Sequence, residues 1–169
     1  MSNHNSGYDI NRAFADSKET QMRDILLNMK AANFLNLRKG TPEEDMKAGS
    51  DMVLFGGNHA IACRVRRTLR KENDLTIRSY NCGHKTELEK LISGAAGVTR
   101  YLYCWCANKS GPIVKWMLID MEKVLESGLL EDNRRDIPNP DGITKFRAYT
   151  PDELRRIDAI MEEWAHDDV

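Results

Sequence analysis

The sequence predicts a single α/β domain in which a strand meander is followed by a helix and two more strands. Three observations indicate this fold class. An amphipathic helical segment comes first, three short strand-like runs follow it, and a helix then precedes two further strand-like runs. The chain has 169 residues, 41% of them hydrophobic and 30% charged, which is typical of one globular domain. We expect this domain to span residues 19–169, after a loosely held arm at residues 1–18.

The first predicted helix begins at Glu19 and ends near Leu37. Its apolar residues recur at the spacing of one helical face; they are Met22, Ile25, Leu26, Met29 and Ala32. A second, short helix is expected from Pro42, because Thr41 and Glu44 have the spacing of a capping box.

Three strand-like runs come next, at residues 51–55, 60–67 and 75–80. Gly56-Gly57-Asn58 is typical of a hairpin turn between the first two runs. In the second run, apolar residues alternate with positions that include Arg64 and Arg66. One face of that strand should therefore be apolar, while the other presents two guanidinium groups. We expect the three runs to pair as an antiparallel meander.

The second half of the chain continues with alternating helices and strands. A helix with Leu88, Leu91 and Ile92 on one side is expected before strands at residues 101–106 and 113–119. Asp120 should cap a helix that ends at Gly128, and residues 131–141 are predicted to form a loop. A final helix is predicted from Thr150, with an inner face formed by Leu154, Ile157, Ile160, Met161 and Trp164.

Hydropathy and charge limit the classes of function. No apolar run approaches the roughly 18 residues of a membrane span, and residues 1–9 lack the pattern of a secretory signal. We therefore expect a cytoplasmic protein without a membrane partner. The net charge is −1, yet six basic and only two acidic residues lie between Arg64 and Arg78. This cluster suits phosphate binding or a solvated hairpin tip, and both interpretations stay open.

The four cysteines are interpreted as reduced thiols rather than as metal ligands. Together with His84, the residues Cys104 and Cys106 could be imagined as a zinc site. The paired Cys-x-x-Cys spacing of structural zinc sites is absent, however. Buried thiols are the favoured interpretation.

A constellation of charged residues is the main candidate for chemistry, because the sequence contains no phosphate loop, nucleophile elbow or zinc-protease motif. Glu43, Glu44 and Asp45 lie on the predicted short helix. Asp51 begins the first strand, and Glu87 opens the helix after the third. Phosphodiester cleavage needs carboxylates that hold divalent ions and a cation that stabilises the transition state. Oxygen ligands of this kind suit Mg²⁺ or Mn²⁺.

The run from Asp45 through Asp51, Arg64-Val65-Arg66 and Glu87 to the strand at Tyr101 resembles the PD-(D/E)XK, or restriction-endonuclease-like, superfamily, which includes Holliday-junction resolvases. The resemblance covers about residues 20–120 and rests on the order of elements more than on a motif. It implies a core of order α-β-β-β-α-β-β with a mixed sheet, followed here by C-terminal helices. It also implies a metal-dependent endonuclease whose partner is nucleic acid, with DNA expected.

The resemblance implies roles for individual residues. Asp45, Asp51 and Glu87 would hold Mg²⁺ or Mn²⁺, and Asp51 and Glu87 would act in catalysis with Arg64 and Arg66. The departure from the family lies at the two arginines, which stand where an acid and a lysine two residues apart are expected. Arg66 could replace the lysine as a fixed cation, although a guanidinium cannot act as a general base. Glu87 would then be an acid that has moved to the following helix.

Further contacts to nucleic acid are expected from the basic segment, namely from Arg67, Arg70, Lys71 and Arg78. Each acidic candidate also has a purely structural interpretation, as a capping residue, a strand start or a first-turn acid. Arg64 and Arg66 need partners if they are buried, and Asp51 or Glu87 could supply them in a network that serves structure alone.

Three functions therefore remain open. The first is a Mg²⁺-dependent nuclease, and the second is a non-catalytic nucleic-acid-binding domain on the same scaffold. The third is a small regulatory protein, of viral or phage origin, that binds another protein. Formation of a homodimer is compatible with each of them.

Overall fold

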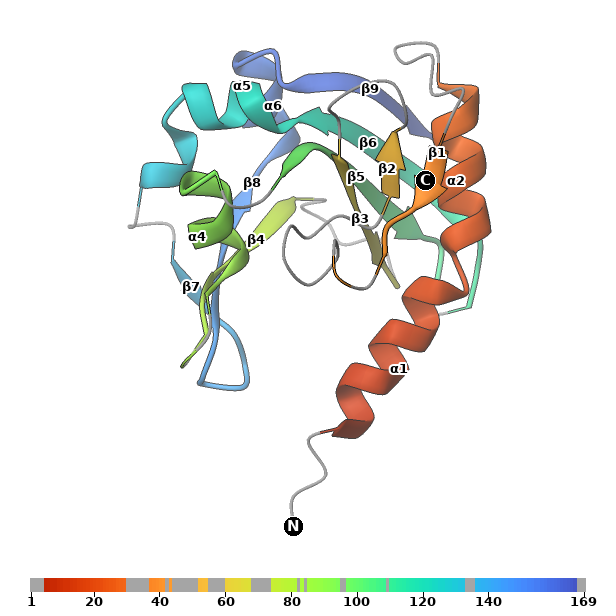
Figure 1. The fold of residues 1–169 in the computed structure, drawn as a ribbon, viewed down its shortest axis with the longest axis horizontal. Coiled ribbons are helices and arrows are strands. Elements are labelled where there is room, and N and C mark those ends of the chain that lie inside the picture. The colour runs from red at the N-terminus through yellow and green to blue at the C-terminus, as the bar shows by residue number, and fades with distance from the viewer. Residues whose placement is uncertain are drawn as a thin grey trace.

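The computed structural model describes most of the chain, and Figure 1 shows its arrangement of two sheets and surrounding helices. The described residues are 5–29, 37–41, 43, 52–54, 60–67, 74–81, 83, 85–94, 97–108, 110–132 and 136–166.

The larger sheet has six strands in the order β1-β2-β3-β5-β6-β9. Their bounds are Leu37–Lys39 for β1, Met52–Leu54 for β2, Ala60–Arg66 for β3, Val98–Cys106 for β5, Ile113–Asp120 for β6 and Ile160–Ala165 for β9. Strands β3 and β5 run parallel, while the other neighbouring pairs are antiparallel. The predicted α/β class with a mixed sheet is thus confirmed.

The smaller sheet has three antiparallel strands in the order β4-β8-β7. They are Leu75–Tyr80 (β4), Lys145–Tyr149 (β8) and Ile137–Pro138 (β7). The predicted meander is correct for β2 and β3 and wrong for its third strand, because β4 pairs with β8 and β3 has β5 as its second neighbour. The predicted loop at residues 131–141 contains β7, and β8 was not predicted. Leu75 and Ile77 of β4 are fully buried, so burial between the sheets decides where this strand goes.

The first two helices of the structure differ from the prediction. Helix α1 spans Asn5–Asp16, so the expected loose arm is helical, and Figure 1 shows it extending away from the sheets. Helix α2 spans Glu19–Asn28 and not residues 19–37, because Met29 adopts an extended conformation with ψ 136°. Leu37, the predicted end of that helix, instead begins β1 and pairs with Leu54.

The predicted final helix is also shorter than expected. Helix α6 spans Pro151–Arg156, and the residues predicted to continue it form β9. Asp158 has a left-handed φ of 54°; its N–H bonds to the carbonyl of Arg155 and the next N–H bonds to that of Leu154. These two bonds form a Schellman motif, which ends the helix. The motif escaped prediction because aspartate stands where glycine usually does.

The predicted caps at Asp120 and Thr150 and the predicted stop at Gly128 are confirmed. Thr86 and Thr150 form capping boxes at the starts of α4 (Glu87–Ile92) and α6. Asp120 caps α5 (Met121–Glu126). Gly128 has a φ of 70° and separates α5 from the 3₁₀ helix η1 (Leu129–Glu131), as expected for a glycine stop. Most of the short helix predicted from Pro42, including Glu44, lies outside the described residues.

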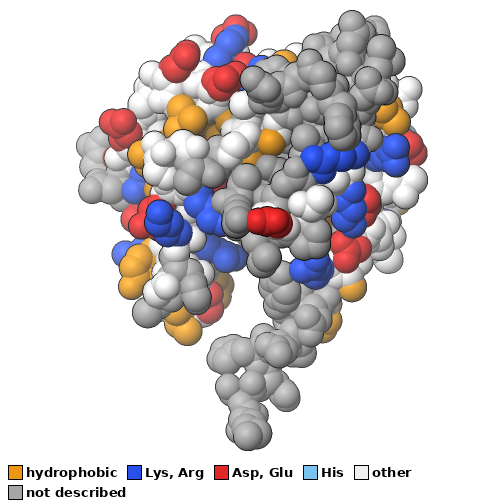
Figure 2. Space-filling view, viewed as in Figure 1, with side chains coloured by type: hydrophobic (Ala, Val, Ile, Leu, Met, Phe, Trp, Pro, Cys, Tyr) orange, Lys and Arg blue, Asp and Glu red, His pale blue; other side chains and the backbone are white. Residues whose placement is uncertain are grey.

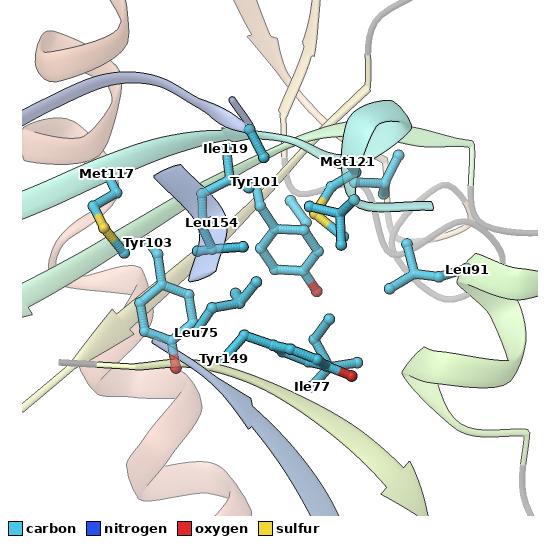
Figure 3. Packing of buried hydrophobic residues seen from close by; sticks show 14 of the residues in the cluster. Leu75, Ile77, Leu91, Tyr101, Tyr103, Met117, Ile119, Met121, Tyr149 and Leu154 are labelled. Atoms are coloured by element: carbon cyan, nitrogen blue, oxygen red, sulfur yellow. The ribbon is translucent and has the colours of Figure 1, made fainter. Parts of the chain in front are cut away.

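Two buried clusters lie on opposite faces of the six-stranded sheet. On one face, Met22 and Leu26 of α2 pack against residues such as Leu102. On the other face, Figure 3 shows Tyr101 and Tyr103 pointing from the six-stranded sheet toward residues of the three-stranded sheet. The fold is therefore layered, and β3 faces β4 at one end of the second cluster. No helix of the described chain is both long and apolar enough to cross a membrane.

Candidate functional site

Arg64 and Arg66 project from β3 toward the three-stranded sheet. Ala62, two residues before Arg64, belongs to the cluster between the sheets, whereas Ile61 belongs to the cluster under α2. Side chains alternate along a strand, so the arginines share the face of Ala62. The predicted face with two guanidinium groups is confirmed.

Arg64 links three elements through its guanidinium group. One terminal nitrogen donates to the carbonyl of Thr76 at 3.0 Å, and the other donates to Oε1 of Glu87 at 2.8 Å. Oε2 of Glu87 accepts a bond of 3.1 Å from the backbone N–H of Arg78. The side chain of Glu87 is only 18% exposed. The predicted pairing of an arginine with Glu87 is confirmed, and both carboxylate oxygens accept hydrogen bonds within the protein.

Arg66 is held mainly by neutral groups. Its Nε donates to the hydroxyl of Tyr103 at 2.6 Å, and a terminal nitrogen donates to Oγ1 of Thr76. The two hydroxyls lie 2.9 Å apart, and the guanidinium carbon lies 5.5 Å from the centre of the Tyr103 ring. Tyr103 itself is fully buried. These contacts fix the direction of the Arg66 guanidinium group at the border of the core.

Sequence reasoning missed Tyr103 and Thr76 as members of this site. Tyr103 lies in the core, and its hydroxyl also positions Arg66. In the parallel pairing of β3 with β5, Tyr103 stands opposite Arg64 and two positions before Trp105, the partner of Arg66. This neighbourhood becomes visible only when the strand pairing is known, so the local sequence holds no signal for it.

The Tyr103→Phe variant is expected to lower the free energy of unfolding by about 1–3 kcal/mol, because the Nε donor of Arg66 would lose its buried acceptor. Urea denaturation followed by tryptophan fluorescence would measure this loss. Tyr80→Phe is the matched control, since Tyr80 is 49% exposed and should change stability by less than about 0.5 kcal/mol. Equal stability of the two variants would show that the buried hydroxyl contributes nothing to the network.

The other basic residues that were predicted to contact nucleic acid lie in different parts of the structure. Arg67 donates to the carbonyl of Ile10 at 2.9 Å and lies 5.0 Å from the ring centre of Phe14, so it attaches α1 to β3. Arg78 is exposed on β4 beside Glu87. In Figure 2, Lys and Arg side chains gather over the region of β4 and α4. Arg70 and Lys71 lie outside the described residues.

The described residues do not by themselves form the predicted Mg²⁺ or Mn²⁺ site. Asp45 and Asp51 lie outside the described part of the chain. Glu87 is paired with Arg64, and no group of three or more His, Cys, Asp or Glu side chains that could hold a metal occurs among the described residues. A cation adjacent to Glu87 would compete with two N–H donors for the same oxygens.

The cysteines fit the thiol interpretation as far as they are described. Cys104 and Cys106 are buried free thiols, and the side chain of Cys63 is half-buried. Burial raises the pKa of the Cys104 thiol far above its usual range, which keeps it protonated and unreactive. Cys82, and His84 of the imagined zinc site, lie outside the described residues.

Comparisons with protein-family models, with curated proteins and with solved structures gave no match. The site is therefore interpreted from its own geometry. That geometry consists of one arginine paired with a glutamate, a second arginine oriented by two hydroxyls, and a third arginine exposed on β4 of the other sheet.

Proposed function

We propose that this protein binds nucleic acid through the phosphate backbone, at the place where β3 meets β4. The observation that carries the proposal is the setting of Arg66. Its orientation is fixed by the neutral hydroxyls of Tyr103 and Thr76, and no carboxylate within the described residues pairs with it. A guanidinium group that is oriented and not neutralised is well suited to bind phosphate oxygens.

The neighbouring charges favour a polymer of phosphates over a single anion. Arg64, Arg66 and Arg78 lie on two facing strands, with Glu87 as the acidic partner of the first. Thr76, which contacts both β3 arginines, stands two residues before Arg78 on β4. Two residues of a strand span about 7 Å, so the cations are spread over more than one phosphate position. DNA is the polymer that the resemblance to endonucleases suggests.

The test is the dependence of binding on salt. Anisotropy of fluorescently labelled duplex DNA, single-stranded DNA and RNA would be titrated with protein at several NaCl concentrations. Each phosphate contact should add about 0.9 to the slope of log affinity against log salt for a duplex, and about 0.7 for a single strand. We expect a slope with a magnitude of about 2 or more. Binding that does not respond to salt, or the absence of binding to every polymer, rejects the proposal in favour of a protein partner.

A second candidate function is metal-dependent cleavage of the bound nucleic acid. The observation that favours it is the place of Glu87, which begins the helix after β4 and contacts Arg64 of β3. The superfamily that the sequence resembles would have a displaced acid at this point. The pairing of β4 with β8 departs from the meander that this relation implies, and the described residues supply no metal site.

If the protein cleaves nucleic acid, two single variants should lose this activity. Labelled duplex, branched and single-stranded DNA would be incubated with the protein in Mg²⁺, Mn²⁺ or EDTA. We expect cutting that requires metal and is lost in both Asp51→Asn and Glu87→Gln, while DNA binding is retained. Binding by the wild-type protein without any cutting would reject this second function and leave the first in place.

A further inference from the structure

The open end of the three-stranded sheet carries exposed apolar side chains. Tyr80 of β4 is 49% exposed, Ile137 of β7 is 42% exposed, and Ile143 in the turn before β8 is 55% exposed. In Figure 2, hydrophobic side chains are visible at the lower left, over the ends of these strands. Exposed apolar residues that gather in one place are candidates for a binding surface, whereas single ones are ordinary.

Other exposed large apolar side chains of the described chain are spread over different elements. Ile10 lies on α1, Leu27 on α2, Ile92 on α4 and Trp164 on β9. At the end of the three-stranded sheet, by contrast, Tyr80, Ile137 and Ile143 come from two strands of one sheet and from the turn before β8. We call Tyr80, Ile137 and Ile143, together with the neighbouring Arg78, Lys145 and Phe146, the sheet-end surface.

Cations alternate with rings on the sheet-end surface. In one cross-strand row, Arg78 is opposite Phe146, which is opposite Ile137. In the adjacent row, Tyr80 is opposite Lys145, whose ammonium group lies 5.8 Å from the centre of the tyrosine ring. Directly opposed residues have Cβ atoms about 5 Å apart, so each ring has a cation within reach. A surface of this composition matches a ligand that offers both flat rings and negative charge.

The surface is continuous with the proposed phosphate site along β4. Thr76, which contacts Arg66, and Tyr80 lie on the same strand, four residues apart. That separation corresponds to about 13 Å. Arg78 stands between them and is exposed. A single strand that crosses the arginines could therefore place its next bases at Tyr80 without a change in the protein backbone.

We infer that the preferred ligand is single-stranded nucleic acid, with phosphates at Arg64, Arg66 and Arg78 and bases stacked on Tyr80. This inference rests on the proposed function and names its substrate class. A duplex keeps its bases stacked within the helix and offers mainly phosphates to a sheet end. The exposed ring of Tyr80 would therefore find no base face to stack on. A single strand offers base faces as well, and stacking on an aromatic side chain tolerates any sequence.

The experiment compares three labelled ligands of equal length, namely a mixed-sequence single strand, its duplex, and an abasic single strand. Wild-type protein is expected to bind the single strand at least about 10-fold more tightly than the duplex. Tyr80→Ala should weaken binding to the single strand by about 5- to 150-fold, the range for loss of one stacked base. It should leave binding to the abasic strand and the salt slope unchanged, because tyrosine carries no charge.

Two further variants make the result specific. Trp164→Ala removes another aromatic side chain of similar exposure, 45%, from the edge strand of the other sheet and should leave binding unchanged. Lys145→Ala should lower the magnitude of the salt slope for the single strand by about 0.7, because its ammonium group lies beside the Tyr80 ring on which a base stacks. Thermal unfolding of each variant verifies that it is folded; these side chains are exposed, so little change is expected.

The possible failures are distinguishable from one another. Equal affinity for single strand and duplex, with Tyr80→Ala unchanged, overturns the inference and leaves phosphate binding in place. Absence of binding to all three ligands overturns the inference together with the proposed function. A Tyr80→Ala variant that binds single strands normally but sediments at a lower mass than wild type would show that the sheet-end surface joins two copies of the chain, which also overturns the inference.

Discussion

Replacing Arg147 with alanine is expected to lower the free energy of unfolding by about 3 kcal/mol and the melting temperature by about 6–12 °C. Arg147 is only 7% exposed in β8, where it lies between Phe146 and Ala148 in the sequence. Its Nε donates to Asp136 at 2.7 Å, and a terminal nitrogen donates to the carbonyl of Leu130. The variant would leave a carboxylate and a carbonyl without their donor. Asp136 is 27% exposed, which places the loss at the lower end of the range for a broken buried pair.

The matched control for this variant is Arg155→Ala. Arg155 also forms ion pairs, with Asp152 and Glu163, but its side chain is 48% exposed. Exposed pairs contribute about 0–1 kcal/mol, so this control should unfold at nearly the wild-type denaturant concentration. Guanidinium denaturation followed by circular dichroism measures both variants. A similar small loss in both would contradict the role assigned to burial.

The Arg147–Asp136 pair also predicts a dependence on pH. Burial raises the pKa of Asp136, but hydrogen bonds from Arg147 and Ser79, together with the charges of Arg147 and Lys145, outweigh it and hold this pKa below the usual value of 3.8. Because the pKa is lower in the folded state, the stabilisation is present above the unfolded value and is lost as the pH falls through the folded one. The stability difference between wild type and Arg147→Ala should therefore shrink on acidification below 3.8. A difference that stays constant from neutral pH to about pH 3 would contradict this linkage.

Replacing Arg64 and Arg66 together with glutamine is expected to weaken nucleic-acid binding by about 100-fold or more at about 0.1 M salt. A hydrogen bond that involves a charged group contributes about 1.5–3 kcal/mol, and two such contacts would be lost. The magnitude of the salt slope should fall by about 2, since each phosphate contact contributes about 1. Glutamine keeps an N–H donor near Thr76 and Tyr103, so the variant tests charge more than packing.

The control for the double variant is Arg155→Gln, which removes an exposed arginine in the last turn of α6. We expect its affinity to change by less than about twofold, because it lies away from β3 and β4. Melting temperatures of all three proteins establish that the comparison is made between folded chains. If the double variant retained the wild-type affinity and salt slope, the phosphate contacts would lie elsewhere and the proposed site would be rejected.

The candidate site was predicted in part because some of its features are local. Alternation along β3 was enough to place Arg64 and Arg66 on one face, since successive side chains of any strand point to opposite sides. Burial of one strand face then required a carboxylate partner, and Glu87 is that partner for Arg64. The hydroxyls of Thr76 and Tyr103 come from β4 and β5, and no local pattern relates either strand to Arg66.

Two strands show how local patterns mislead. β4 was recognised as a strand from its alternation, but its neighbour β8 lies about 70 residues further along the chain and not next to it. In β9, Ile160 and Met161 continue the helical spacing that begins at Leu154, so the sequence suits a helix there as well. The left-handed Asp158 ends the helix, and pairing with β6 makes the following residues a strand.

The sequence by itself determined the starts of α4, α5 and α6, the stop at Gly128 and the two faces of β3. These features depend on capping hydrogen bonds and on side-chain alternation, and both involve residues within a few positions of one another. The tertiary structure alone decided that β3 lies beside β5 in parallel, that β4 joins β8, and that residues 160–165 form an edge strand. Strand pairing is stabilised by burial of side chains against partners that are distant in sequence, and several pairings satisfy the same local pattern. Arg66 acquires its fixed direction, and with it the proposed function, only from that choice.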